Sequence, residues 1–123
     1  QLAAGSPYLR ATPAAIESMV TNLINNSLAA FERSKTQERT IIVRTEVHGT
    51  LFTLRVLDSG PGIVGVTTKD IWLPGVTTNP NGTGLGLTIV RDAVLELGGE
   101  VDAVEHSELG GAEIVIELPI IGV

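Results

Sequence analysis

The sequence contains no cysteine and only a handful of aromatic residues, namely one Trp, one Tyr and two Phe among 123. The absence of cysteine excludes disulfides and thiolate metal sites, and it fits a reducing compartment. With so few aromatic rings, a core has to be built from Leu, Ile, Val and Ala. Hydrophobic residues still make up 43% of the chain, which is enough for one folded domain.

Positive charge is scarce as well. Eight Lys and Arg stand against 14 Asp and Glu, giving a formal net charge of −6, and the cations do not cluster. This argues against a nucleic-acid partner, because neutralising phosphates requires clustered cations. No apolar run approaches the roughly 20 residues of a membrane span, and no signal peptide is evident. We therefore expect a cytoplasmic domain without membrane contact. The chain begins at Gln1 rather than Met, so we expect it to be a fragment of a longer protein. That parent protein could carry a membrane anchor.

The pattern of apolar residues predicts two helices and four strands. Helical spacing runs from Pro13, with Thr12 as N-cap, to about residue 33, and again over 84–97. Two β-rich runs follow each helix: 40–47 and 50–57 after the first helix, and 100–106 and 112–118 after the second. We predict turns between the paired runs at His48-Gly49 and at Gly110-Gly111. A long loop covers 58–82. This order predicts a two-layer α/β sandwich, with both helices on one face of a mixed, largely antiparallel sheet.

The first predicted helix carries asparagines beside its apolar stripe. At 100° per residue the stripe is centred near Leu23 and Ser27, and Asn22 and Asn26 stack on one flank of it. Carboxamide oxygens are ligands that Mg²⁺ accepts, together with waters and substrate phosphates. An isolated pair of asparagines is nevertheless more often a polar boundary of a helix.

Asp58-Ser59-Gly60-Pro61-Gly62 comes directly after a strand that is nearly all apolar. A carboxylate at the end of a strand, beside bare glycine backbone, can accept a hydrogen bond from an exocyclic amine such as that of adenine. Taken alone, the same stretch is typical of a simple Asp-x-Gly turn.

The stretch NGTGLGLTIV, at 81–90, places a glycine at every second position before an apolar helix. Alternate glycines leave successive N–H groups unshielded, and a helix N-terminus favours negative charge, so the stretch suits a phosphate. The spacing of Gly82, Gly84 and Gly86 is neither the dinucleotide fingerprint nor a P-loop. On its own, this motif is weak evidence.

In this order the three motifs resemble the ATP-binding domain of sensor histidine kinases, within the wider ATPase superfamily of type II topoisomerases and heat-shock chaperones. The resemblance runs from about Ala14 to Pro119, and the segment at 77–87 is most similar to nitrogen-regulatory-type kinases. It implies one domain over 1–123 that binds ATP and Mg²⁺. It also implies an ATP lid at about 62–83, mobile without nucleotide.

The resemblance further implies the roles of individual residues. Asn26 is the expected Mg²⁺ ligand, with Asn22 as a possible second, and Asp58 is the carboxylate that recognises adenine. The other ATP-binding positions that it implies are Gly60, Gly62, Ile63, Thr78, Gly82, Thr83, Gly84, Leu85, Gly86 and Leu87.

Asn22 stands where the topoisomerase and chaperone branches carry a glutamate that activates water. An amide cannot act as a general base near neutrality, so the chain is expected to hold ATP for transfer to another nucleophile. By resemblance, the acceptor is a histidine on a separate dimerisation domain of the same protein, with a response regulator downstream. His48 and His106 lack the context of an acceptor and are predicted to be surface residues.

Some positions depart from the family pattern. The segment 72–75, Trp-Leu-Pro-Gly, keeps one aromatic of the usual Phe-x-Pro-Phe, and Asn79 and Ala112 replace a frequent Lys and a frequent Thr. Lys69 and Arg91 are the nearby cations that could replace the missing positive charge at 79. Each is more often an ordinary surface residue. Two alternatives follow: a non-catalytic ATP or ADP switch module, and a serine kinase of the anti-sigma-factor type, against which Asn22 argues.

Overall fold

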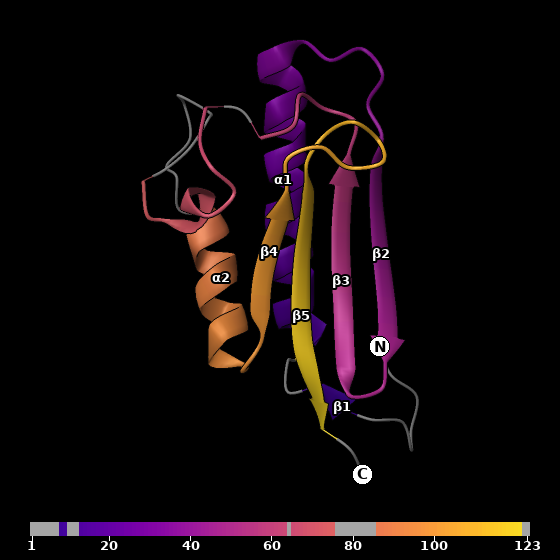
Figure 1. Cartoon of the computed structure of the whole chain (residues 1–123), viewed down its shortest axis with the longest axis vertical. Helices are drawn as coiled ribbons and strands as arrows, with labels where there is room; N and C mark the ends of the chain where they lie inside the picture. The colour runs from indigo at the N-terminus through magenta and orange to yellow at the C-terminus, as the bar shows by residue number, and fades with distance from the viewer. Residues whose placement is uncertain (1–7, 10–12, 64, 76–85, 122–123) are drawn as a thin grey trace.

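The computed structural model describes residues 8–9, 13–63, 65–75 and 86–121 (Figure 1). In chain order its elements are β1 (Tyr8–Leu9), α1 (Pro13–Ser34), β2 (Ile41–His48), β3 (Leu51–Asp58), the 3₁₀ helix η1 (Asp70–Trp72), α2 (Gly86–Glu96), β4 (Glu100–Val104) and β5 (Glu113–Ile121). Within these residues, neither helix is both long enough and apolar enough to span a membrane.

One sheet forms a layer of the molecule, and α1 and α2 cover one of its faces (Figure 1). β5 is the central strand: β3 pairs along one side of it, while β4 and β1 pair along the other. β2 pairs with β3 and forms an edge. The two-layer α/β sandwich is therefore confirmed. Every ladder between the described strands is antiparallel, so the described part of the sheet is not mixed.

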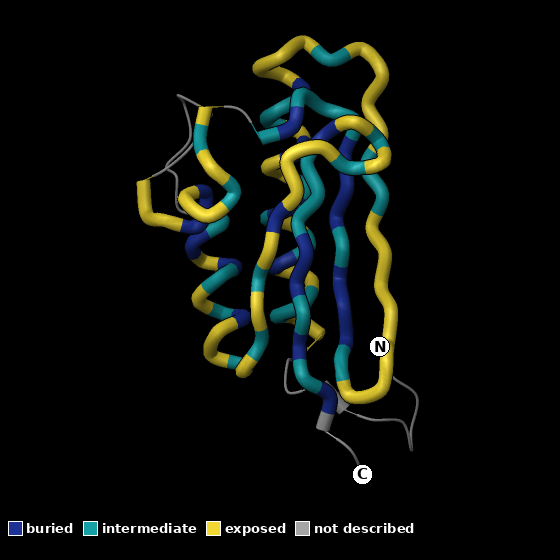
Figure 2. The backbone as a smooth tube through the Cα atoms, in the orientation of Figure 1, coloured by how far each residue is buried: buried dark blue, intermediate teal, exposed yellow. Residues whose placement is uncertain are grey.

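The core lies between the helices and the two inner strands. Alternate residues of β3 and β5 point to the same face, as strand geometry requires, and they meet one stripe of each helix. These buried side chains are Met19, Leu23, Phe52, Leu54, Val56, Val90, Val94, Ile116, Leu118 and Ile120. Figure 2 shows the result: β3 is largely buried, whereas β2 is exposed over 43–48.

Two turns differ from their predictions. His48 pairs with Leu51, so the first hairpin turns at Gly49-Thr50, one residue later than predicted, with Gly49 at φ +60°. The second connection is wider. β4 already ends at Val104, and a loop over 105–112 joins it to β5, with its turn at Ser107–Gly110, where the Gly110 N–H donates to the Ser107 carbonyl. The predicted Gly110-Gly111 turn is therefore wrong.

Candidate functional site

Asp58, the last residue of β3, is only 5% exposed and forms the centre of the candidate site. Its Oδ1 accepts hydrogen bonds from the backbone N–H groups of Gly60 at 2.9 Å and Ala112 at 3.1 Å. Its Oδ2 accepts one from the Ser27 hydroxyl at 2.7 Å. The donors come from three separate segments, so the orientation of the carboxylate is fixed where α1, the end of β3 and the 105–112 loop meet.

The loop at 105–112 is bound to Asp58 by its backbone as well. The Asp58 N–H donates to the Ala112 carbonyl, and the Gly111 N–H donates to the Asp58 carbonyl, both at 3.0 Å. The Ser107 hydroxyl also donates to that carbonyl, at 3.4 Å. These bonds hold Gly111 and Ala112 against the end of β3. Because these bonds hold Gly111 and Ala112, the turn between β4 and β5 lies at Ser107–Gly110, before the predicted Gly110-Gly111 position.

Close packing requires Gly62 and leaves little room at Gly60. Gly62 is buried, at φ +83°, and a Cβ there would lie 2.5 Å from the Glu105 carbonyl oxygen and 2.9 Å from the His106 ring. A Cβ at Gly60 would lie 3.2 Å from Asp58 Oδ1. Gly62, which the sequence assigned to a ligand, thus also allows the 105–112 loop to approach the chain after β3.

On α1, Ser27 connects the helix that carries the predicted asparagines to Asp58. The Ser27 side chain is buried, its neighbour Asn26 is exposed and Asn22, one turn earlier, is partly buried. Because Ser27 bonds to Asp58, the turn of α1 that carries Asn26 is held against the end of β3. Sequence analysis assigned Ser27 only to the apolar stripe. A hydroxyl at the centre of a buried stripe requires a polar partner, and that signal was available.

The remaining predicted positions fall at the start of α2 or before it. Gly86 is the first residue of α2, and Leu87 is partly buried against the core. Ile63, after β3, is partly buried and donates its N–H to the Glu105 carbonyl at 3.4 Å. The predictions for Thr78, Gly82, Thr83, Gly84 and Leu85 lie outside the described residues.

Part of the predicted lid is packed into a small cluster of its own. Ile71 and Trp72 in η1 are buried together with Ala103 of β4. The Thr88 hydroxyl of α2 donates to the Trp72 carbonyl at 2.9 Å. Leu73, the next residue, is exposed. This turn of the predicted lid is therefore attached to α2 and the sheet.

The two candidate cations have the character of surface residues. Lys69 is exposed, and the Arg91 guanidinium lies 3.1 Å from the carboxylate of Asp92, its exposed neighbour in sequence.

The two histidines are exposed, as predicted. His48 lies 3.0 Å from the Glu46 carboxylate, and this hydrogen bond lowers the pKa of Glu46. His106 lies in the 105–112 loop, with Nδ1 3.2 Å from the Gly110 carbonyl oxygen.

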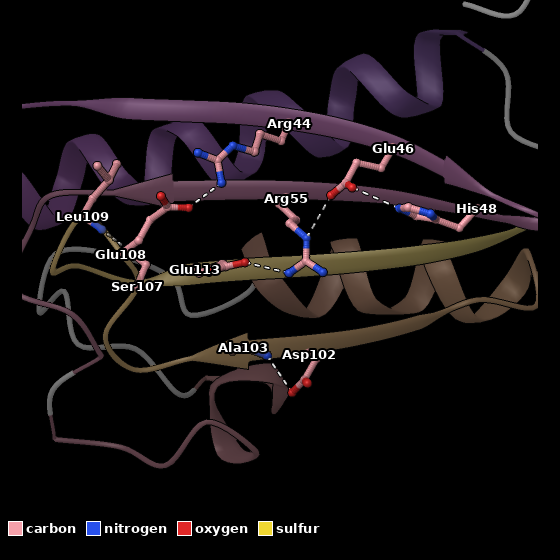
Figure 3. A network of polar contacts seen from close by, with 10 residues as sticks. All are labelled: Arg44, Glu46, His48, Arg55, Asp102, Ala103, Ser107, Glu108, Leu109 and Glu113. Carbon is pink, nitrogen blue, oxygen red and sulfur yellow. Dashed lines mark hydrogen bonds and ion pairs between the residues drawn. The ribbon is translucent and has the colours of Figure 1, made fainter.

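A network of ion pairs covers the face of the sheet opposite the helices (Figure 3). Arg55 lies 2.8 Å from Glu113 and 3.6 Å from Glu46, which connects β2, β3 and β5. Arg44 donates a hydrogen bond to Glu108, which lowers the pKa of the Glu108 carboxyl and raises that of Arg44. The loop that binds Asp58 is thus also connected to the edge strand β2.

Comparison with known proteins agrees with this arrangement. The model of the histidine kinase-, DNA gyrase B- and HSP90-like ATPase family matches residues 11–121. The sensor protein CitS of Halalkalibacterium halodurans is 36% identical over 104 residues, which cover 83% of this chain and 19% of that protein. The sensor protein RstB of Escherichia coli is 35% identical over 85% of this chain and 24% of its own length. The chain thus spans less than a quarter of either relative.

Solved structures show the same fold. The catalytic domain of the histidine kinase ThkA superposes with a TM-score of 0.73 at 29% identity, covering 90% of this chain and 71% of that one. Full-length ShkA, solved in complex with AMPPNP, gives a TM-score of 0.76 at 25% identity, covering 97% of this chain and 24% of that one.

Proposed function

This chain belongs to the family of histidine kinase-, DNA gyrase B- and HSP90-like ATPases, and we propose that it is the ATP-binding catalytic domain of a two-component sensor histidine kinase. One observation carries the proposal: two of the motif segments, α1 and the stretch after β3, meet the 105–112 loop at the buried Asp58 carboxylate, which is held in one orientation.

The hydrogen bonds to Asp58 fit an adenine base. A carboxylate oxygen accepts about two hydrogen bonds in its plane. Oδ1 already accepts two, from Gly60 and Ala112, whereas Oδ2 accepts one, from Ser27. Among the hydrogen bonds between described residues, one acceptor position therefore remains on Oδ2. It matches the exocyclic amine of adenine.

The residues present also fit a magnesium ion. Among the described residues, no group of three His, Cys, Asp or Glu side chains could hold a metal. The exposed Asn26 carboxamide, on the turn of α1 held beside Asp58, offers one neutral oxygen. Mg²⁺ is commonly bound by one or two protein oxygens together with waters and phosphates, so Asn26 would hold it jointly with the nucleotide.

For the reaction, this chain would supply binding and orientation. ATP provides the γ-phosphoryl group, and a histidine nitrogen of a phosphoacceptor domain forms the new N–P bond while the bond to the ADP oxygen breaks. Asn22 provides no base, which suits transfer rather than hydrolysis, because phosphoryl transfer depends mainly on positioning and charge neutralisation. In this proposal the acceptor domain belongs to the same protein, a response regulator receives the phosphoryl group, and this domain lies in the cytoplasm.

Calorimetric titration with ATP, in Mg²⁺ and in EDTA, tests the proposal. We expect Asn26→Ala to lose the Mg²⁺-dependent part of the affinity, since it removes the oxygen ligand. Asn25→Ala is the matched control, because Asn25 is an exposed asparagine on the other flank of α1, and it should bind as wild type does.

Absence of binding by the wild-type chain at millimolar ATP would refute the proposal. If ATP binds but the label of [γ-³²P]ATP never reaches the acceptor domain of the same protein, the chain is a nucleotide switch and not a kinase domain.

A further inference from the structure

Ser27 lies against the carboxylate oxygen on which nucleotide binding depends. Its side chain is buried, on the stripe of α1 that faces the core, and its hydroxyl lies 2.7 Å from Asp58 Oδ2. We propose that Ser27 is a positioning residue that determines which purine base the site accepts. This inference rests on the proposed function, because it takes Asp58 as the group that contacts the base.

The two backbone donors determine which carboxylate oxygen faces which way. The N–H groups of Gly60 and Ala112 both donate to Oδ1, and backbone N–H groups cannot accept in return. Whatever occupies the place of Oδ1 therefore has to be an acceptor. Oδ2 is therefore the carboxylate oxygen that is available to select between purine bases.

Ser27 then adds a second atom of fixed polarity beside Oδ2. A hydroxyl can donate or accept, but a carboxylate oxygen only accepts, so the Ser27 proton is committed to Oδ2. The lone pairs left on Oδ2 and on the serine oxygen are all acceptors. A purine with an amine at carbon 6 can donate a hydrogen bond to these acceptors. A purine with a carbonyl at carbon 6 would place its own acceptor against them, which is repulsive.

Without the hydroxyl, Oδ2 still only accepts, but the protein no longer fixes the polarity of the atom beside it. Oδ2 would lose its fixed donor, and a water molecule, which can present either a proton or a lone pair, could take the place of Ser27. The carboxylate would also have one restraint fewer. Both changes weaken binding of a 6-amino purine more than binding of a 6-oxo purine.

Titrations with ATP and ITP, which differ at carbon 6, measure the effect. Wild type should prefer ATP, and Ser27→Ala should lose about tenfold in ATP affinity with little change for ITP, so the ATP-to-ITP ratio falls by a similar factor. Ser34→Ala is the control: Ser34 is also on α1, and its hydroxyl donates to the Ala30 carbonyl, away from Asp58. A Ser27→Ala chain with a lower unfolding temperature but an unchanged ratio would overturn the proposal.

Asp58→Asn tests the same geometry by inverting it. The two N–H groups would hold the amide oxygen in the place of Oδ1, which puts the amide NH₂ in the place of Oδ2. Ser27 would then turn to accept, and the position would present donors. We expect this variant to bind ITP more tightly than ATP. Continued preference for ATP would overturn the assigned orientation.

These outcomes separate the two proposals. If wild type binds no ATP, the proposed function and this inference fail together. If wild type binds ATP and Asp58→Asn loses it, but Ser27→Ala keeps the wild-type ratio, then only the role of Ser27 is refuted.

Discussion

Individual glycines around Asp58 are needed because two segments of backbone approach each other there. A Cβ at Gly111 would lie 2.1 Å from Asp58 Oδ1 and 2.6 Å from the Gly60 nitrogen. The neighbouring Gly110 has open space around it, although its φ is +91°. Two adjacent glycines are thus required for different reasons, one by contact and one by backbone conformation.

Gly111→Ala should therefore be far more damaging than Gly110→Ala. We expect the first to lower the free energy of unfolding by about 3 kcal/mol, because the loop has to move away from Asp58. The second should cost about 1 kcal/mol, the price of a positive φ alone. Urea unfolding of both variants checks this. Equal costs would mean that the contact with Asp58 is not tight in solution.

At the scale of elements, η1 joins the predicted lid to the body of the domain. Ile71 and Trp72 pack with Ala103 of β4, and Thr88 of α2 bonds to the Trp72 carbonyl. The aromatic residue that remains of the family's lid motif therefore anchors this segment, whereas Leu73 beside it is exposed.

Trp72→Ala should release this anchor. We expect a loss of about 3 kcal/mol in the free energy of unfolding, the usual effect of removing a buried aromatic side chain. Leu73→Ala, the matched control, should change it by less than about 1 kcal/mol, because that side chain is largely exposed. Urea denaturation measures both. Similar values for the two would show that η1 is not docked.

The sequence predicted the long elements well and the short ones poorly. Helix α1 begins at Pro13 and ends at Ser34, one residue beyond the prediction, because an apolar period repeated over several turns is a strong signal. β1 has two residues and pairs with the far end of β5, so its only support is long-range. η1 has three residues, too few for any period to be visible.

The same contrast holds within the site. Asp58 was predicted from its place between an apolar strand and two glycines, and it lies buried at the end of β3. Its partners Ser27 and Ala112 are 31 and 54 residues away in sequence. Local patterns carry no information on such pairings, which depend on how α1 and the 105–112 loop pack against the sheet.

At the scale of the whole molecule, ion pairs connect the strands on the face of the sheet opposite the helices (Figure 3). The ion pairs of Arg44 with Glu108 and of Arg55 with Glu113 connect the edge strand, the inner strands and the 105–112 loop. Arg44 and Glu108 are well exposed, so salt screens their attraction.

Glu108→Gln should show a dependence on pH and salt that identifies this pair. The pKa of Glu108 is lowered in the folded state by Arg44, so its contribution to stability is present above the unfolded value of about 4.3 and is lost as the pH falls through the lower, folded value. The difference in unfolding temperature between wild type and variant should be small at pH 7, shrink toward pH 3 and shrink again in 1 M salt. A difference independent of both pH and salt would contradict this origin.

The central position of β5 has a consequence for how the chain folds. β2 and β3 adjoin in sequence and can pair early, but a two-stranded ribbon is marginally stable alone. β5 begins at Glu113, and only then can β3, β4 and β1 acquire their shared neighbour. Such distant pairings raise the contact order and slow folding. On the ribosome, the sheet therefore stays incomplete until β5 has emerged, and the inner edge of β3 is exposed to other nascent chains until then.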